Sequence, residues 1–123
     1  MKAFYLVTLL FSLVLGAITV NYFYISRLSQ ELIEDVEVLP LPSTDNQVEL
    51  AAKQICDRWE KSRTLVQITA NHTEIEAISN AADELLAFAK YQSIPDFERA
   101  RALLINALEE LELSEKLSFS NIF

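Results

Sequence analysis

The chain has 123 residues, of which 51% are hydrophobic and 23% are charged. That length leaves room for one modest hydrophobic core beside an apolar segment, and it excludes a second domain. Lys2 is the only charged residue before Arg27, so residues 27–123 hold nine basic and all eighteen acidic side chains, a formal net charge of −9. A surface this acidic repels phosphate backbones, so we expect no nucleic-acid partner.

Three scarce residue types exclude further classes of function. The only glycine, Gly16, lies in the apolar segment, so residues 27–123 lack the residue on which phosphate-binding loops depend. A lone Cys56 cannot form an intramolecular disulfide and is most simply a small buried apolar group. A lone His72 cannot complete a usual zinc site. We therefore expect no cofactor, no metal and no enzymatic activity.

The N-terminal segment predicts a membrane anchor. Residues 3–25 carry no charge, and as a helix these 23 residues span about 34 Å, enough for the core of a bilayer. The nearest small-x-small cleavage motif is Leu15-Gly16-Ala17, whose first residue is unsuitable. We predict an uncleaved anchor over residues 1–26, with a secreted protein released by signal cleavage as the alternative.

The residues at the end of this segment indicate how it sits in the membrane. Tyr22, Phe23 and Tyr24 occupy the place of an interfacial aromatic belt, and Arg27 follows them. Lys2 and the amino terminus favour a cytoplasmic N-terminus under the positive-inside rule. The expectation is a single-pass protein of the cell membrane, bound to the bilayer through residues 3–25, with its soluble domain outside.

An amphipathic stretch follows the anchor. Apolar residues recur at spacings of four, four and three, at Leu28, Leu32, Val36 and Leu39. The pattern predicts that the anchor helix continues as a stalk over residues 27–42, where Pro40 and Pro42 end it.

The remaining residues, 43–123, predict a helical domain. Thr44 and Gln47 form a potential capping box, and a heptad seam follows at alternating spacings of four and three, through Val48, Ala52, Ile55, Trp59, Ser62, Val66 and Thr69. The apolar phase slips near residues 70–74, so we place a turn there. Asn71 with Glu74, or Thr73 with Glu76, would cap the next helix. One interrupted helix over residues 44–92 is the alternative.

A last helix begins near Pro95, which suits a first helical turn. Its apolar face comprises Phe97, Ala100, Leu104, Ala107, Leu108 and Leu111. Residues 117–123 show no sustained helical period, and we expect this tail to fold back over an open seam. Short connections between long helices favour antiparallel neighbours. The predicted fold is all-α: a transmembrane helix with a stalk, leading into a three-helix antiparallel bundle or hairpin array.

For most of the candidate side chains, the sequence favours a structural role over a functional one. Trp59 could anchor a partner, but its place in the heptad seam favours core packing. His72 and Glu74 stand at a predicted helix start, which favours a role in the turn or cap. The acidic residues of the stalk share a helix face that presents too few oxygens for a hard cation, so we expect a solvated face at Glu31, Glu34 and Asp35.

Several stretches of the chain resemble a known family. They are the Lys-led anchor, the helix centred on Trp59, the segment His72-Thr73-Glu74-Ile75 with Ile78 after it, and the stretch from Glu115 to Asn121-Ile122-Phe123. The chain resembles the small membrane-anchored proteins of Gram-positive bacteria grouped as domain of unknown function 4363. That resemblance implies a membrane-tethered helical domain facing the envelope. It marks five residues as candidate interaction or structural residues: Trp59, His72, Glu74, Ile75 and Phe123.

Architecture and elimination favour a structural or interaction module tethered outside the cytoplasm, which binds another envelope protein or a second copy of itself. The alternative is a domain that senses a small ligand between its helices. Only about two residues would then lie inside the cell, so sensing would have to work through a membrane partner.

Overall fold

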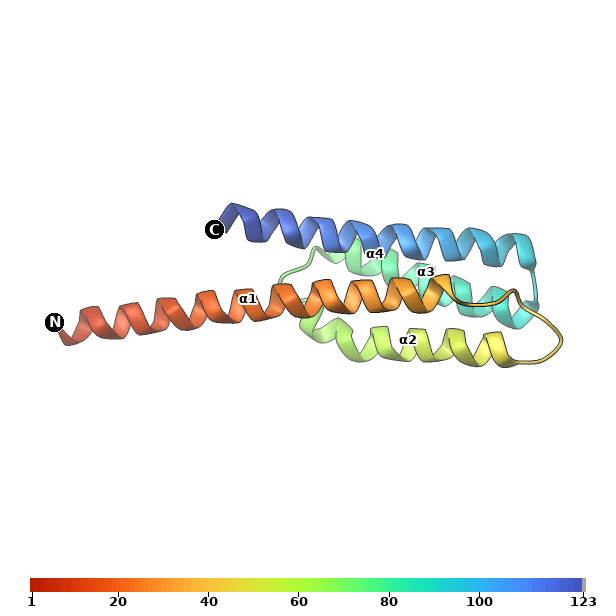
Figure 1. The fold of residues 1–123 in the computed structure, drawn as a ribbon, viewed down its shortest axis with the longest axis horizontal. Coiled ribbons are helices and arrows are strands. Elements are labelled where there is room, and N and C mark those ends of the chain that lie inside the picture. The colour runs from red at the N-terminus through yellow and green to blue at the C-terminus, as the bar shows by residue number, and fades with distance from the viewer. Residues whose placement is uncertain (123) are drawn as a thin grey trace.

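The computed structural model describes residues 1–122, and these residues form four helices and no strand. They are α1 (Lys2–Glu37), α2 (Gln47–Val66), α3 (His72–Tyr91) and α4 (Ile94–Ile122). Figure 1 shows the chain reversing direction at each connection, with the N-terminal part of α1 projecting beyond the other three helices. The all-helical prediction is therefore confirmed.

The first helix has two halves with opposite surroundings. Residues 2–14 are exposed, and the helix is long and apolar enough to cross a membrane. The second half is packed into the core through Ile25, Leu28, Ser29, Leu32 and Val36. No residue between Lys2 and Glu37 interrupts the helix. One continuous rod thus joins the exposed apolar segment to the packed helices.

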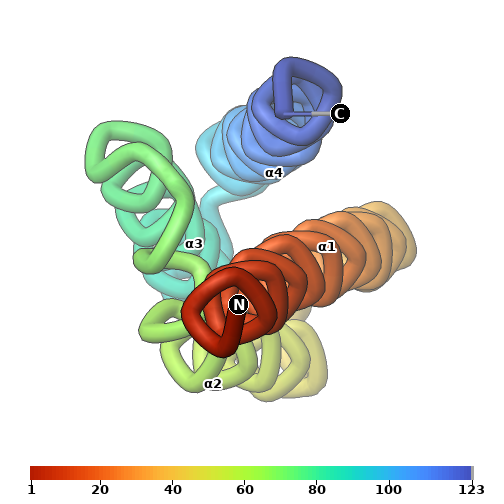
Figure 2. Tube along the Cα trace, turned by 90° about the vertical axis from the view of Figure 1, so that its left-hand side faces the viewer, coloured from red at the N-terminus to blue at the C-terminus, as the bar shows by residue number. Residues whose placement is uncertain are grey.

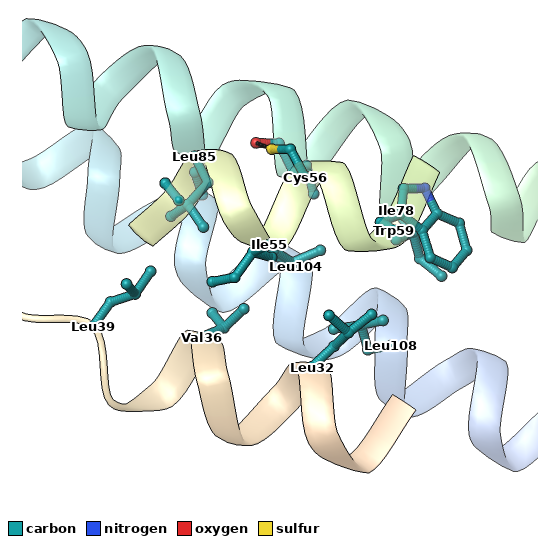
Figure 3. Packing of buried hydrophobic residues seen from close by; sticks show 14 of the residues in the cluster. Leu32, Val36, Leu39, Ile55, Cys56, Trp59, Ile78, Leu85, Leu104 and Leu108 are labelled. Carbon is teal, nitrogen blue, oxygen red and sulfur yellow. Dashed lines mark hydrogen bonds between the residues drawn. The ribbon is translucent and has the colours of Figure 1, made fainter. Parts of the chain in front are cut away.

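The segment expected as a stalk, residues 27–42, is a core element. Leu32 and Val36 are 1% and 0% exposed, and Figure 3 shows both pointing into the interior toward side chains of the other helices. The spacing of its apolar residues predicted the face correctly but not its partner, because that partner is α4, some 80 residues further along the chain. The packed part, here called the helical body, therefore comprises residues 25–39, α2, α3 and α4, one helix more than expected.

Figure 2 looks along the helices and shows how they are arranged. α4 packs closely against α1 on one side and α3 on the other, and α2 packs against α3. The contact between α1 and α2 is much looser. One contiguous cluster of buried apolar side chains fills the centre. Trp59 and Phe97, at 1% and 0% exposure, are its largest members.

The connections between the helices confirm some of the predicted helix ends and turns. α1 ends at Glu37, before the two prolines, and α2 and α3 are separate helices joined near residue 70, as predicted. The Asn71 side chain caps α3 by accepting a 2.8 Å hydrogen bond from the Thr73 amide. The capping box predicted at Thr44 and Gln47 is wrong, because α2 begins at Gln47 itself and Asn46 is the residue before it.

The link between α3 and α4 is short and contains no glycine. Gln92 adopts a left-handed conformation with φ of 57°, which ends α3 in the place that glycine usually takes. Ser93 Oγ then donates a 2.7 Å hydrogen bond to Asp96 Oδ2, and Pro95 lies in the first turn of α4 as predicted.

The expectation that residues 117–123 fold back as a tail is wrong for the part that the structure describes. α4 continues to Ile122 without a break. No glycine or proline follows Pro95, so nothing in the sequence stops the helix. Glu115 is buried on the apolar face of α4, but because its side chain is charged, it interrupts the apolar spacing by which the sequence would show that the helix continues. Phe123 lies outside the described residues.

Candidate functional site

The two halves of α1 meet at a junction where residues 18–24 contact the ends of α2 and α4. The Tyr22 ring stacks on Phe119 of α4, with ring centroids 4.4 Å apart and an angle of 13° between the ring planes. Phe23 lies edge-on to Tyr22, with a centroid distance of 5.2 Å. The end of α4 is thereby held against the exposed half of α1, below the main core.

A chain of polar side chains runs through this junction. Asn21 Nδ2 of α1 donates a 2.8 Å hydrogen bond to Thr69 Oγ1, in the connection between α2 and α3. The Thr69 hydroxyl in turn donates to the Glu115 carboxyl group of α4, whose oxygens lie 3.1 and 3.3 Å away. Three segments separated by more than 40 residues are tied together by these contacts.

Glu115 is 7% exposed, and the pKa of its carboxyl group is altered. Burial raises its pKa, the hydrogen bond from Thr69 opposes that change, and the nearby charge of Glu74 adds to it. The Oε2 atom of Glu74 is itself buried and has no hydrogen-bond partner within residues 1–122. The junction therefore holds two acidic side chains in a confined space, one of which has a raised pKa.

The candidate residues marked by sequence are divided between this junction and the core. Glu74 borders the junction, whereas Ile75 is 1% exposed and belongs to the core. The His72 side chain is 75% exposed, and its Nε2 lies 3.0 Å from Glu76 Oε1 on the next turn of α3. His72 thus stands at the start of α3 and makes a local contact within that helix.

Trp59 and Cys56 lie in the interior. The Trp59 indole Nε1 donates a 2.8 Å hydrogen bond to Ser79 Oγ, which ties α2 to α3. The Cys56 thiol donates to the backbone oxygen of Ala82 over 3.2 Å. Burial, aided by the charge of Asp83, raises the pKa of this thiol to about 11, so it stays protonated and unreactive at neutral pH.

The four residues predicted at a membrane interface surround the junction. Tyr22 and Tyr24 are partly buried against α4 and the core, and Phe23 is 61% exposed. The Arg27 side chain is 83% exposed, and its Nε lies 3.0 Å from Glu31. These residues therefore lie beside the junction end of the helical body, and not further along α1 toward its N-terminus.

A groove follows the loose seam between α1 and α2. Arg58 bridges its middle by pairing with Glu31, and its Nη1 lies 3.5 Å from Asp35. The hydrogen bonds from Arg58 and Arg27 lower the pKa of Glu31, so two of the three acidic residues on this face are already paired with arginine. At its junction end the groove contains a pocket of about 510 Å³ with an almost wholly apolar lining. The pocket is lined by Gly16, Ala17, Ile18, Val20, Asn21, Tyr24, Leu65, Ile68 and Thr69.

Sequence reasoning missed the polar chain through the junction. Two signals were present: Asn21 is an amide in an uncharged apolar span, and Glu115 continues the apolar face of α4 at helical spacing from Leu108 and Leu111. Neither signal names a partner, because the residues come together only in the folded chain. Within residues 1–122, no three His, Cys, Asp or Glu side chains are grouped so that they could hold a metal ion.

Comparison with known proteins gives one match. The sequence profile of the family described as "Domain of unknown function (DUF4363)" matches residues 19–122. That segment covers most of the chain, including the whole helical body and the junction, so the chain belongs to this family. No curated protein and no solved structure matches the chain.

Proposed function

We propose that this member of the domain of unknown function 4363 family is a membrane-tethered structural or interaction module outside the cytoplasm. In this account residues 3–25 cross the bilayer from a cytoplasmic N-terminus, and the helical body is an antiparallel bundle. The observation that carries the proposal is the continuity of α1, which supplies both the exposed apolar half and a buried core face. The anchor and the bundle are then one mechanical unit.

This continuity has a consequence for binding. A bundle that shares a helix with its anchor cannot pivot about a flexible linker, so its surfaces keep a fixed orientation to the membrane. A partner, which is another envelope protein or a second copy of the chain, would meet a preoriented surface. The net charge of −9 on residues 27–123 favours a partner with a basic surface.

The interior supports a role without catalysis. A thiol-dependent enzyme would need an activated cysteine, but the only thiol is buried and bonded to a backbone oxygen, and its pKa is raised to about 11. The only imidazole contacts Glu76 on its own helix and not that thiol. We therefore propose that the chain acts by binding.

The orientation is tested by labelling Ser43→Cys with a membrane-impermeant maleimide in intact cells. Ser43 is exposed in the connection between α1 and α2, at the end of the helical body furthest from the anchor. The parent chain is the matched control, because its buried Cys56 should not react. Labelling of intact cells supports the proposal, and labelling only after lysis contradicts it. The mass of the purified protein separates an intact anchor from signal cleavage.

The partner is sought by cross-linking in intact membranes of the producing organism. The full chain is compared with a chain in which residues 1–26 are kept and the helical body is removed. A partner captured reproducibly by the full chain alone supports an interaction module and identifies its target. Cross-links between copies of the chain support self-association.

One observation favours a second candidate function, a sensor of a small apolar ligand. The groove at the junction has the apolar lining and the size of a ligand site. A sensor would be stabilised by its ligand, so palmitate added to the chain in nanodiscs should raise the unfolding temperature. Ser43→Cys should keep that increase. Gly16 lines the groove, and nothing lies within 4 Å of a Cβ at this position, so the indole of Gly16→Trp can occupy the groove and should abolish the increase. An unchanged unfolding temperature in the parent chain excludes this ligand.

A further inference from the structure

Three segments that reach the junction end of the helical body carry no Asp, Glu, Lys or Arg. They are residues 3–26 of α1, residues 64–73 at the end of α2 and in the connection to α3, and residues 117–122 at the end of α4. Charged residues make up 23% of the chain, so composition alone does not explain why three uncharged segments meet at one end of the body. These segments at the junction end therefore lack the charged side chains found along the rest of the helical body.

The same segments expose large apolar side chains. Outside α1, the exposed fractions are 71% for Ile68, 57% for Leu117, 51% for Ile122 and 48% for Leu65. These residues come from the ends of α2 and α4 and from the connection that follows α2, beside the apolar half of α1. In α1, Val20 and Phe23 are 70% and 61% exposed. Apolar surface gathered in this way is unfavourable in water and marks a binding surface.

The length of α1 indicates what covers this surface. The junction contacts fix Asn21 level with Thr69 and Glu115. As a helix, residues 3–21 span about 28 Å, close to the roughly 30 Å of a hydrocarbon core. A span that begins at Lys2 therefore leaves the hydrocarbon near Asn21. Ile68 and Leu117 lie close to this level, and α4 continues past it toward the N-terminus of α1.

The first charges above the uncharged segments agree with that level. On α1, α2 and α4 they are Arg27, Arg63 and Lys116, all basic in a domain with a net charge of −9. Cations at this height meet lipid phosphate groups, and a lysine stem can extend from apolar surroundings to reach them. On α3 the first charge is Glu74, and one of its oxygens is turned into the protein. The side chains of Asn21, Thr69 and Glu115 at the junction are bonded to one another, as a lipid environment requires.

We propose that the junction end of the helical body is inserted into the outer leaflet of the bilayer, with Ile68 and Leu117 in contact with lipid. This inference rests on the proposed function, because it needs residues 3–25 to span the membrane. The bundle would then be a partly immersed body whose height is fixed by α1, and its apolar groove between α1 and α2 would open to acyl chains.

The test uses the full chain with Cys56→Ala, reconstituted in vesicles of phosphatidylcholine and phosphatidylglycerol. Single cysteines at Ile68 and at Leu117 carry an environment-sensitive fluorophore, and doxyl-labelled lipids act as quenchers in the hydrocarbon. Leu103→Cys is the control, because Leu103 is 48% exposed, against 57% for Leu117 on the same helix, but lies on the body away from the junction. Phe11→Cys, 64% exposed in the middle of the span, reports on the anchor.

Insertion predicts that doxyl groups near the headgroup end of the acyl chains quench the labels at Ile68 and Leu117 several-fold more than the label at Leu103. Doxyl groups near the chain ends should quench the label at Phe11 most. Quenching at Phe11 alone overturns the inference and leaves the tether intact. Loss of quenching at Phe11 itself refutes the tether and the insertion together. Blue-shifted emission at Ile68 without lipid quenching means that protein covers the surface, a second copy or another chain, and also overturns the inference.

Discussion

Substitution of Leu32 by alanine distinguishes a core helix from a stalk. Leu32 is 1% exposed and packs within the central cluster, so Leu32→Ala leaves a cavity among side chains of several helices. Such truncations cost about 2–5 kcal/mol, which is a large part of the roughly 5–15 kcal/mol by which a domain is stable. Alanine is the better helix former, so helix propensity adds nothing to this loss.

The assay is urea unfolding of the full chain in a mild non-ionic detergent, followed by the fluorescence of Trp59. Trp59 is the only tryptophan and lies in the same core, so its emission reports on the helical body. With a denaturant slope of roughly 1.5 kcal/mol per M, the unfolding midpoint should fall by about 1–3 M. Leu50→Ala, at an exposed site on α2, should change the unfolding free energy by about 0.5 kcal/mol or less. Equal effects of the two substitutions would show that residues 27–42 are a stalk after all.

Three further predictions concern single contacts. Asn71→Ala removes the cap of α3 and should lower the unfolding free energy by about 1 kcal/mol, whereas Asn71→Ser should retain most of it; loss from both would argue against a cap. Ser79→Ala leaves the buried Trp59 N–H unpaired and should cost about 1–3 kcal/mol. In a double-mutant cycle followed by circular dichroism, because Trp59→Phe removes the fluorescent reporter, Trp59→Phe should reduce that cost; additive effects would exclude the bond. Because burial raises the pKa of Glu115, its stabilising effect is complete below the usual carboxyl pKa and is lost as pH rises through the raised value. Glu115→Gln should therefore stabilise the chain at neutral pH and flatten the pH dependence above about pH 5, and a parallel profile would contradict this assignment.

Local patterns in the sequence were sufficient for the fold class and for most of the helix boundaries. The phase slip near residue 70, the capping side chain of Asn71 and the position of Pro95 are signals between near neighbours, and each is confirmed. The apolar spacing around Leu28 and Leu32 also identified the correct face of the helix. Such signals state which surface is buried but not what it is buried against.

The errors arose where a partner far along the chain decides the outcome. The apolar face of residues 27–42 is buried against α4, and no local signal in either sequence marks that contact, so the pattern alone predicts a stalk. Glu115 interrupts the apolar period of α4 and so predicts a tail that folds back, whereas in the structure Thr69 satisfies that carboxyl group and the helix continues. The junction of Asn21, Thr69 and Glu115 could not be predicted for the same reason.

The proposed rigid tether depends on α1 being one unbroken helix that joins the apolar segment to the core. Hydrogen exchange of the full chain in nanodiscs, followed by mass spectrometry of peptides covering residues 15–36, tests this directly. We predict slow exchange throughout, because the backbone bonds are first shielded by lipid and then by the packed body. Rapid exchange confined to residues 22–27 would reveal a hinge between anchor and body, and would contradict both the rigid tether and the fixed depth of the junction.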